Sequence, residues 1–219
     1  GFAMREQVIE RIRAKKIITI VRGVYGEQVA HLAEALAAGG VELMEVTFDQ
    51  SDTAAHAQTA AAIHAIKAHM GERMLVGAGT VTTPSLVEMA KEAGAEYIVS
   101  PDLRPAVIER TRELGMVSLP GALTPTEINN AYDAGADFVK VFPAAQLGPA
   151  YIKAVRGPLN HIPLLAVGGV NEKNIADFIK AGCCGAGVGG NLVNKQWIAA
   201  GEWDRITALA KEFVEAVCE

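Results

Sequence analysis

The chain has 219 residues, half of them hydrophobic, and a formal net charge of −5. This acidic balance argues against a nucleic-acid partner, and no apolar run approaches the roughly 18 residues that a membrane-spanning helix needs. The cysteines, Cys183, Cys184 and Cys218, show no metal-ligand spacing, and no secretory leader is visible, so we expect a cytoplasmic protein.

The first segment of the chain predicts a helix over residues 5–15. Gly1, Phe2 and Ala3 precede Met4 and look like a remnant of cloning, so Met4 is the expected start. No linker or change of composition follows, and residues 4–219 are expected to form one domain.

Short apolar runs of strand length then alternate with amphipathic helical stretches. Because each unit of strand and helix spans ~20–30 residues, the pattern indicates parallel strands joined by helical crossovers. Eight such units predict a (β/α)₈ barrel, closed by a last helix over residues 204–217, with a doubly wound open sheet as the alternative. The predicted strands are 17–21, 41–46, 74–76, 97–99, 116–119, 138–141, 164–167 and 185–188.

Several of the helical stretches end in the same way, with a glycine before the next strand. These glycines lie in Ala38-Gly39-Gly40, Ala93-Gly94-Ala95, Ala134-Gly135-Ala136 and Ala181-Gly182-Cys183. Each of these turns suits a left-handed backbone conformation that ends a helix.

Lys140 is the strongest catalytic candidate, because it lies within an apolar run of strand length, Phe138-Val139-Lys140-Val141-Phe142. Burial would lower the pKa of its amine, and a neutral amine can form a Schiff base with a carbonyl substrate. A lysine that merely reaches solvent or pairs with an acid is the alternative. If Lys140 points into the barrel, Phe138 and Phe142 do so too, while Val139 and Val141 face the helices.

Glu45 is the candidate acid and base, since a carboxylate late in a buried strand must be paired or functional. Strand alternation groups it with Leu43 and Thr47. It could move a proton through a water near the Schiff base. An ion pair with Lys140 that only holds the barrel mouth together is the alternative, and the sequence alone does not separate the two.

Arginine and glycine residues at other predicted strand ends suggest binding of an anionic substrate. Arg22 ends the first strand and could hold a carboxylate or phosphate through two hydrogen bonds. Gly168-Gly169 and Gly189-Gly190 follow the last two strands, where barrels often bind phosphate through backbone amides. The five histidines, His31, His56, His64, His69 and His161, lie away from strand ends, and we predict neither a metal nor a cofactor.

These residues lie in motifs that resemble one known family, the class I 2-keto-3-deoxy-6-phosphogluconate (KDPG) aldolases, also called 4-hydroxy-2-oxoglutarate (KHG) aldolases. The similarity runs from about Ile17 to Val193. The motifs occur in family order: Glu45-Val46-Thr47, Gly77-Ala78-Gly79-Thr80-Val81, Ser100-Pro101, Pro120-Gly121, Thr124-Pro125-Thr126-Glu127, Lys140-Val141-Phe142-Pro143 and Gly168-Gly169-Val170.

The resemblance implies a role for each matching residue. Lys140 matches the Schiff-base lysine, and Glu45 matches the acid and base that works through a water. Thr80 matches a threonine beside the pyruvate carboxylate, and Arg22 is assigned to the same carboxylate. Pro101 and Phe142 match pocket walls. The substrate phosphate would meet Gly168 and Gly169, and Gly190 and Asn191 lie where the second phosphate loop falls. The family also implies a homotrimer without a metal.

Three positions depart from the family pattern. Asp49 replaces an arginine found in part of the family, and an acid there could repel a phosphorylated sugar acid. Val167 replaces a threonine often found before the glycine pair. The resulting Ala166-Val167-Gly168-Gly169-Val170 resembles the phosphogalactonate branch, whereas Glu45-Val46-Thr47 resembles the gluconate branch. Gly190 replaces a serine of the last phosphate loop, and we expect Asn191 to supply the lost donor.

The sequence therefore predicts an aldolase that cleaves KDPG to pyruvate and glyceraldehyde 3-phosphate, with possible action on 4-hydroxy-2-oxoglutarate. One alternative is an aldolase for the 6-phosphogalactonate epimer. Another is a barrel that binds a phosphate or keto acid without catalysis. An isomerase or synthase that shares only the phosphate loops is disfavoured, because no carboxylate or cysteine pair lies at the strand ends.

Overall fold

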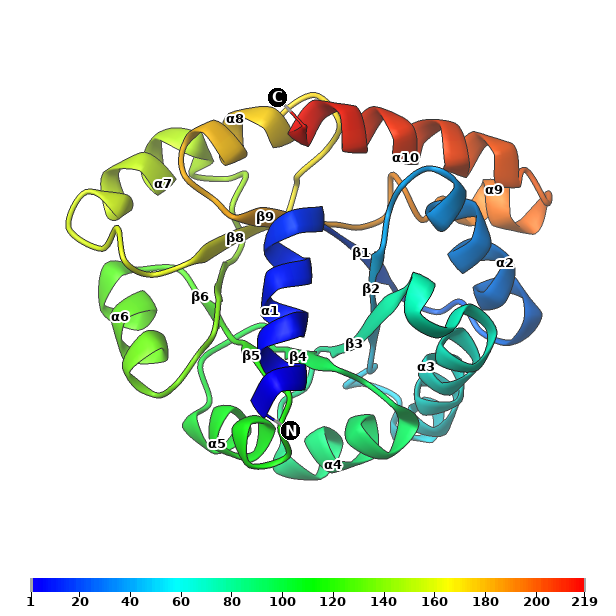
Figure 1. Ribbon diagram of the computed structural model, residues 1–219, viewed down its shortest axis with the longest axis horizontal. Coiled ribbons are helices and arrows are strands. Elements are labelled where there is room, and N and C mark those ends of the chain that lie inside the picture. Colours follow the sequence, from blue (N-terminus) through cyan, green and yellow to red (C-terminus); the bar gives the residue numbers. More distant parts are fainter. Residues whose placement is uncertain (1, 219) are drawn as a thin grey trace.

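Parallel strands form the centre of the molecule, and helices surround them (Figure 1). The structure is a computed structural model that describes residues 2–218. The strands are joined side by side in the order β5-β4-β3-β2-β1-β9-β8-β7-β6. They are β1 (Ile17–Val21), β2 (Leu43–Thr47), β3 (Leu75–Gly79), β4 (Tyr97–Val99), β5 (Val117–Leu119), β6 (Gly121–Ala122), β7 (Val139–Val141), β8 (Leu164–Val167) and β9 (Gly185–Val188).

Helices connect successive strands and cover the outside of the sheet, as the alternating pattern predicts. Short 3₁₀ helices η1 (Thr53–Ala55) and η2 (Gly71–Arg73) flank α3. The α-helices are α1 (Phe2–Lys15), α2 (Gly26–Ala38), α3 (His56–Met70), α4 (Pro84–Ala93), α5 (Pro105–Glu113), α6 (Pro125–Asp133), α7 (Gly148–Arg156), α8 (Ile175–Lys180), α9 (Lys195–Ala199) and α10 (Trp203–Val217).

The barrel has one more strand than predicted because its fifth strand is broken at Pro120. β5 pairs with β4, and β6, one residue further on, pairs with β7. The backbone N–H of Lys140 donates to the carbonyl of Pro120 at 2.9 Å, which joins β7 to the residue between the two halves. Thus one interrupted strand links both ends of the sheet. The predicted (β/α)₈ barrel is confirmed, and the open sheet is wrong.

β3 extends further than predicted, through glycines that disfavour strands in isolation. It pairs with β2 along its whole length, from Leu43 opposite Leu75 to Thr47 opposite Gly79. A side chain at Gly77 would overlap the Tyr97 ring, and one at Gly79 would overlap the Glu45 carboxylate. These glycines are therefore explained by what their neighbours place inside the barrel, which the sequence pattern does not reveal.

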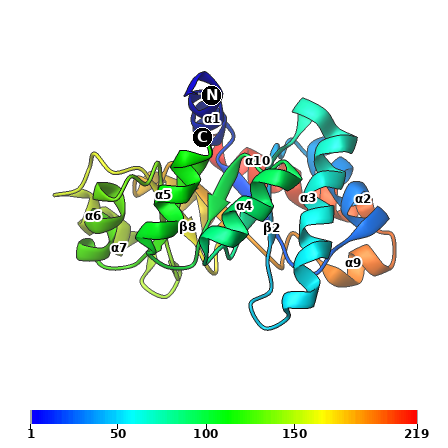
Figure 2. The same ribbon diagram turned by 90° about the horizontal axis from the view of Figure 1, so that it is seen from below.

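The N-terminal helix α1 closes one end of the barrel (Figure 2). Its Val8 and Ile12 are buried against a layer of interior strand residues that includes Ile18 and Phe138. Arg5 forms a buried ion pair with Asp137, two residues before β7. α1 was predicted over residues 5–15 but begins at Phe2, so it includes residues 2 and 3 of the expected cloning remnant. Gly1 of that remnant and the last residue, Glu219, lie outside the described residues.

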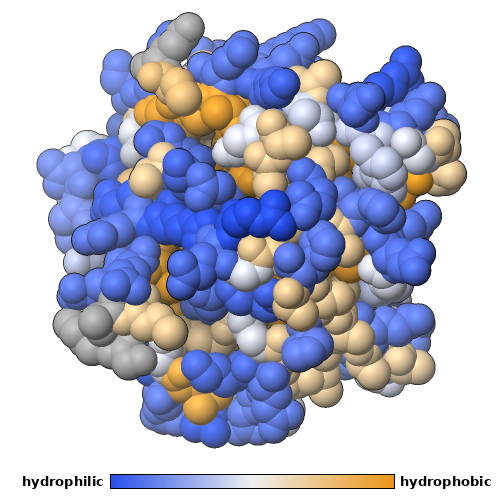
Figure 3. All heavy atoms as spheres, turned by 45° about the vertical axis from the view of Figure 1, so that its right-hand side comes forward, coloured by the Kyte–Doolittle hydropathy of each residue, from blue (hydrophilic) through white to orange (hydrophobic). Residues whose placement is uncertain are grey.

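The predicted turns are also observed. One glycine of each helix-ending motif, Gly40, Gly94, Gly135 and Gly182, has a positive φ. The predicted last helix is α10, while the short α9 before it was not predicted. No helix within residues 2–218 combines the length and apolar character that crossing a membrane requires. Around α2 and α3 the surface is mostly hydrophilic, with small apolar patches (Figure 3).

Candidate active site

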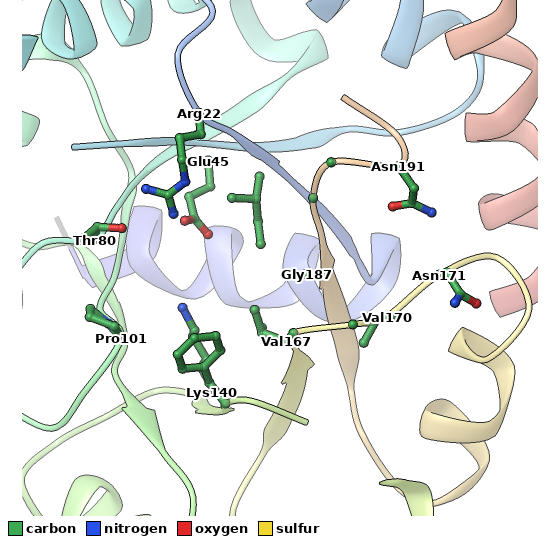
Figure 4. A pocket seen from close by; sticks show the side chains of 16 residues that line it. Arg22, Glu45, Thr80, Pro101, Lys140, Val167, Val170, Asn171, Gly187 and Asn191 are labelled. Atoms are coloured by element: carbon green, nitrogen blue, oxygen red, sulfur yellow. The ribbon is translucent and has the colours of Figure 1, made fainter. Parts of the chain in front are cut away.

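A cavity of about 520 Å³ opens at the carboxyl ends of the strands, whereas α1 packs against the interior layer at the other end of the barrel. Figure 4 shows its side chains converging from several strands. All of the predicted site residues line it: Arg22, Glu45, Thr80, Pro101, Lys140, Phe142, Gly168, Gly169, Gly190 and Asn191. Because strands end together at this face, residues more than a hundred positions apart meet in one space.

Lys140 lies in the middle of β7 and is only 7% exposed. Burial lowers the pKa of its amine, the negative charge of Glu45 opposes this shift, and the positive charge of Arg22 reinforces it. The Nζ atom lies 4.7 Å from the centre of the Phe142 ring. Phe138 also points inward, as predicted, but it packs in the interior layer against α1, away from the cavity. The amine is thus poised to be neutral more often than a solvated lysine.

Glu45 comes from β2 and points toward Lys140 from the other side of the cavity (Figure 4). The residue is 3% exposed, and burial raises the pKa of its carboxyl despite the opposing charges of Lys140 and Arg22. Within residues 2–218 no ion pair or hydrogen bond joins Glu45 directly to Lys140. The structure therefore does not contain the Glu45–Lys140 ion pair that was the alternative to an acid and base role for Glu45.

Arg22 follows β1 and is the exposed cation at the rim of the cavity. None of the ion pairs in the described part of the chain includes it. The guanidinium therefore remains able to bind an anionic ligand. Asp49 does not line the cavity. Its carboxylate instead accepts hydrogen bonds from the backbone and hydroxyl of Ser51, which lower its pKa.

Thr80 and Pro101 line the side of the cavity that lies beyond Glu45 and Lys140 (Figure 4). Thr80 has a positive φ of 52°, which is unusual for a β-branched residue. Phe142 is 38% exposed, so its ring covers the amine from the solvent side. These residues give the cavity one hydroxyl and two apolar walls near the amine.

Two glycine-rich loops form the other side of the cavity. The backbone N–H groups of Gly168, Gly169, Val170, Gly189, Gly190 and Asn191 donate no hydrogen bond to the described residues. Gly168 and Gly169 have φ values of 101° and 73°, so the turn after β8 requires glycine. Free amides on facing loops suit a phosphate or another anion.

Asn191 is engaged differently from the prediction that it donates to phosphate. Its side-chain nitrogen donates to Glu172 at 3.0 Å and so joins the two glycine-rich loops. Glu172 was not considered from the sequence, since a polar loop residue gives no signal of such a contact. The side-chain amide of Asn191 is therefore bound to Glu172 rather than free to donate to a phosphate.

Several lining residues were not among the predicted site residues: Ile20, Val167, Val170, Asn171 and Gly187. Strand alternation offered a signal for two of them, because Ile20 lies two residues before Arg22 and Gly187 two residues before Gly189. Within residues 2–218 no cluster of three or more His, Cys, Asp or Glu side chains could hold a metal ion.

Comparison with known proteins gives a consistent result. The family model described as "KDPG and KHG aldolase" matches residues 8–209. The 2-dehydro-3-deoxy-6-phosphogalactonate aldolase of Escherichia coli strain K12 is 36% identical over 203 residues, which cover 92% of this chain and 96% of that protein. The 2-dehydro-3-deoxy-phosphogluconate aldolase of Haemophilus influenzae is 32% identical and covers 97% of both chains.

A solved structure is similar in fold over almost the same length. It is the KDPG aldolase of Legionella pneumophila with pyruvate captured at low pH as a covalent carbinolamine intermediate. It has a TM-score of 0.82 at 26% identity and covers 93% of this chain and 96% of that one.

Proposed function

The chain belongs to the KDPG and KHG aldolase family, and from this we propose that it cleaves 2-keto-3-deoxy-6-phosphogluconate to pyruvate and glyceraldehyde 3-phosphate. It is a carbon–carbon lyase of the Schiff-base class. The observation that carries the proposal is the pair of buried, facing groups Lys140 and Glu45 in the cavity at the carboxyl ends of the strands.

Lys140 begins the reaction with its neutral amine, whose lowered pKa supports this role. The amine attacks the C2 carbonyl of the substrate, and loss of water from the carbinolamine leaves a protonated imine. This cation accepts the electron pair of the C3–C4 bond as that bond breaks, and an enamine of pyruvate forms. Protonation of the enamine at C3 and hydrolysis of the imine release pyruvate and return the amine.

Glu45 moves the protons through a bound water. It takes the proton of the C4 hydroxyl as the aldehyde leaves, and it later returns a proton to C3 of the enamine. Its raised pKa suits both steps, because a carboxyl that titrates closer to neutrality can accept and donate a proton. Since no direct bond to Lys140 occupies the carboxylate, it is available to a water.

The substrate's two anionic ends bind on opposite sides of the amine. Arg22 and the Thr80 hydroxyl hold the carboxylate, while Pro101 and Phe142 enclose the carbon chain. The phosphate meets the free amides of the two glycine-rich loops, at Gly168-Gly169 and Gly190-Asn191. With its two ends bound in this way, the substrate is expected to present C2 to Lys140, which lines the cavity between the two sides.

Borohydride trapping tests the proposal. Incubation with pyruvate and borohydride should add one pyruvyl group, reduced to a stable secondary amine, and peptide mapping should locate it on Lys140. Omission of borohydride is the control, because an unreduced imine hydrolyses during the workup. A folded protein that forms no adduct would favour a barrel that binds keto acids without cleaving them.

Cleavage of the 6-phosphogalactonate epimer is a second candidate, favoured by the residue before the glycine pair. Val167 lines the cavity and is 7% exposed. Unlike a threonine, it has no hydroxyl to offer the substrate. A relative named for this epimer is also 36% identical. Comparison of kcat/KM for KDPG, its epimer and 4-hydroxy-2-oxoglutarate decides among these substrates. We expect the third to be the weakest, because it leaves the loop amides without a phosphate.

We also propose the homotrimer that the family implies and the cytoplasmic location that the sequence suggests. A solution mass three times that of the chain, measured by light scattering, would support the trimer, and a monomer would contradict it.

A further inference from the structure

The backbone of Thr80 is held in a conformation that its side chain disfavours. Its φ of 52° lies in the left-handed region, where β-branched residues are rare. Such a conformation persists only where surrounding contacts hold it, and these sites are often functional. Backbone hydrogen bonds secure the neighbours of Thr80: Phe48 donates to Gly79 at 3.0 Å, and Val81 donates to Val99 at 3.1 Å.

Gln50 makes the contact with Thr80 itself. Its Nε2 atom donates to the carbonyl oxygen of Thr80 at 2.9 Å, and its Oε1 atom accepts from the hydroxyl of Thr82 at 2.7 Å. One side-chain amide thus bridges the residues on both sides of Val81. The two bonds also fix the orientation of the amide, because a flipped group would place its oxygen against the carbonyl of Thr80.

The loop that carries Gln50 is itself held by neighbouring contacts. The carboxylate of Asp49 accepts from the backbone of Ser51 at 2.9 Å and from its hydroxyl at 2.6 Å. The carbonyl of Asp49 lies 2.9 Å from a ring nitrogen of His56 at the start of α3. Asp49 therefore shapes the loop after β2, and this loop presents Gln50 to the loop after β3.

We propose that Gln50 is a positioning residue for the aldolase reaction, acting through Thr80. It holds the backbone of Thr80 so that the hydroxyl faces the cavity where the carboxylate of the keto acid binds (Figure 4). This inference rests on the proposed function. It assigns a task to the segment of Asp49 and Gln50, which does not line the cavity and which the mechanism does not use.

Gln50→Met tests the proposal, because methionine has a similar length but makes neither hydrogen bond and adds no charge. The concentration of pyruvate that half-saturates borohydride trapping should rise about tenfold, the factor that corresponds to loss of about one hydrogen bond. The trapping rate at saturating pyruvate should fall less than about threefold, since Lys140 and Glu45 are untouched. Gln58→Met, at an exposed position of α3, is the matched control and should change neither value.

Thr80→Gly separates positioning from general loop stability. Glycine removes the hydroxyl and tolerates a positive φ, so Gln50→Met should add no further rise in the half-saturating concentration in that background. An equal additional rise, or an unchanged value for Gln50→Met in the wild-type background, would overturn the proposal. Absence of any adduct in the wild type would instead refute the proposed function and, with it, the positioning role.

Discussion

Lys140→Ala is expected to abolish aldol cleavage while the barrel stays folded. Without the amine no imine forms, and the C3–C4 bond has no cation to accept its electrons. Turnover should fall by at least about 10⁴-fold, the scale seen when a covalent nucleophile is removed. A coupled assay of pyruvate release measures the rate, and circular dichroism measures the fold. Near-normal cleavage by the variant would remove the basis of the Schiff-base mechanism.

Lys140→Met controls for the space left by the alanine, and Lys180→Ala, on the exposed face of α8, controls for loss of a positive charge. Lys140→Met should be inactive, whereas Lys180→Ala should retain full activity.

The difference in stability between Lys140→Met and the wild type should depend on pH in a defined direction. The folded-state pKa of Lys140 lies below the ordinary value of 10.5, so charging this amine opposes folding. That penalty is full below the folded-state pKa and disappears as the pH rises toward 10.5. The melting temperature of Lys140→Met should thus equal or exceed that of the wild type at neutral pH, and the difference should shrink at alkaline pH.

Glu45→Gln is expected to slow turnover by about 10²–10⁴-fold, which is the usual contribution of a general acid and base. Imine formation with pyruvate should persist, because Lys140 remains. Loss of the Glu45 charge should also lower the pKa of Lys140 further, since this charge opposes the effect of burial. Trapping with borohydride and steady-state cleavage, measured on the same sample, separate the two steps.

Glu27→Gln, on the exposed face of α2, is the matched control for Glu45→Gln and should leave both steps unchanged. Equal loss of trapping and turnover in Glu45→Gln would mean that the carboxylate supports the lysine rather than the proton transfers.

Sequence periodicity was sufficient for much of the fold and for the position of the site. The apolar run around Lys140 and the alternation of Leu43, Glu45 and Thr47 predict which side chains point inward. Parallel strands end at one face, so the strand ends also select the residues that meet there. For this reason Arg22 and the glycine pairs were predicted from the strand ends, whereas Thr80 was predicted from the family motif that contains it.

Other features depended on contacts between distant segments. The break at Pro120 is visible as an interruption, but only pairing with β4 on one side and β7 on the other makes it part of one strand. Asn191 matches the position of a phosphate loop, yet its amide donates to Glu172. The sequence suggests that Asp49 repels an anionic substrate, and only the structure shows that its carboxylate lies outside the cavity lining and accepts hydrogen bonds from Ser51.

By itself the sequence determined the alternation of strands and helices, the inward face of the strands that carry Glu45 and Lys140 and the family to which the chain is similar, because these follow from local periodicity and short motifs. Only the tertiary structure decided the electrostatics of Lys140 and Glu45 and the support of Thr80 by Gln50. A pKa depends on burial and on charges that the fold brings close. A side-chain hydrogen bond depends on distances of a few tenths of an ångström, which sequence spacing does not specify.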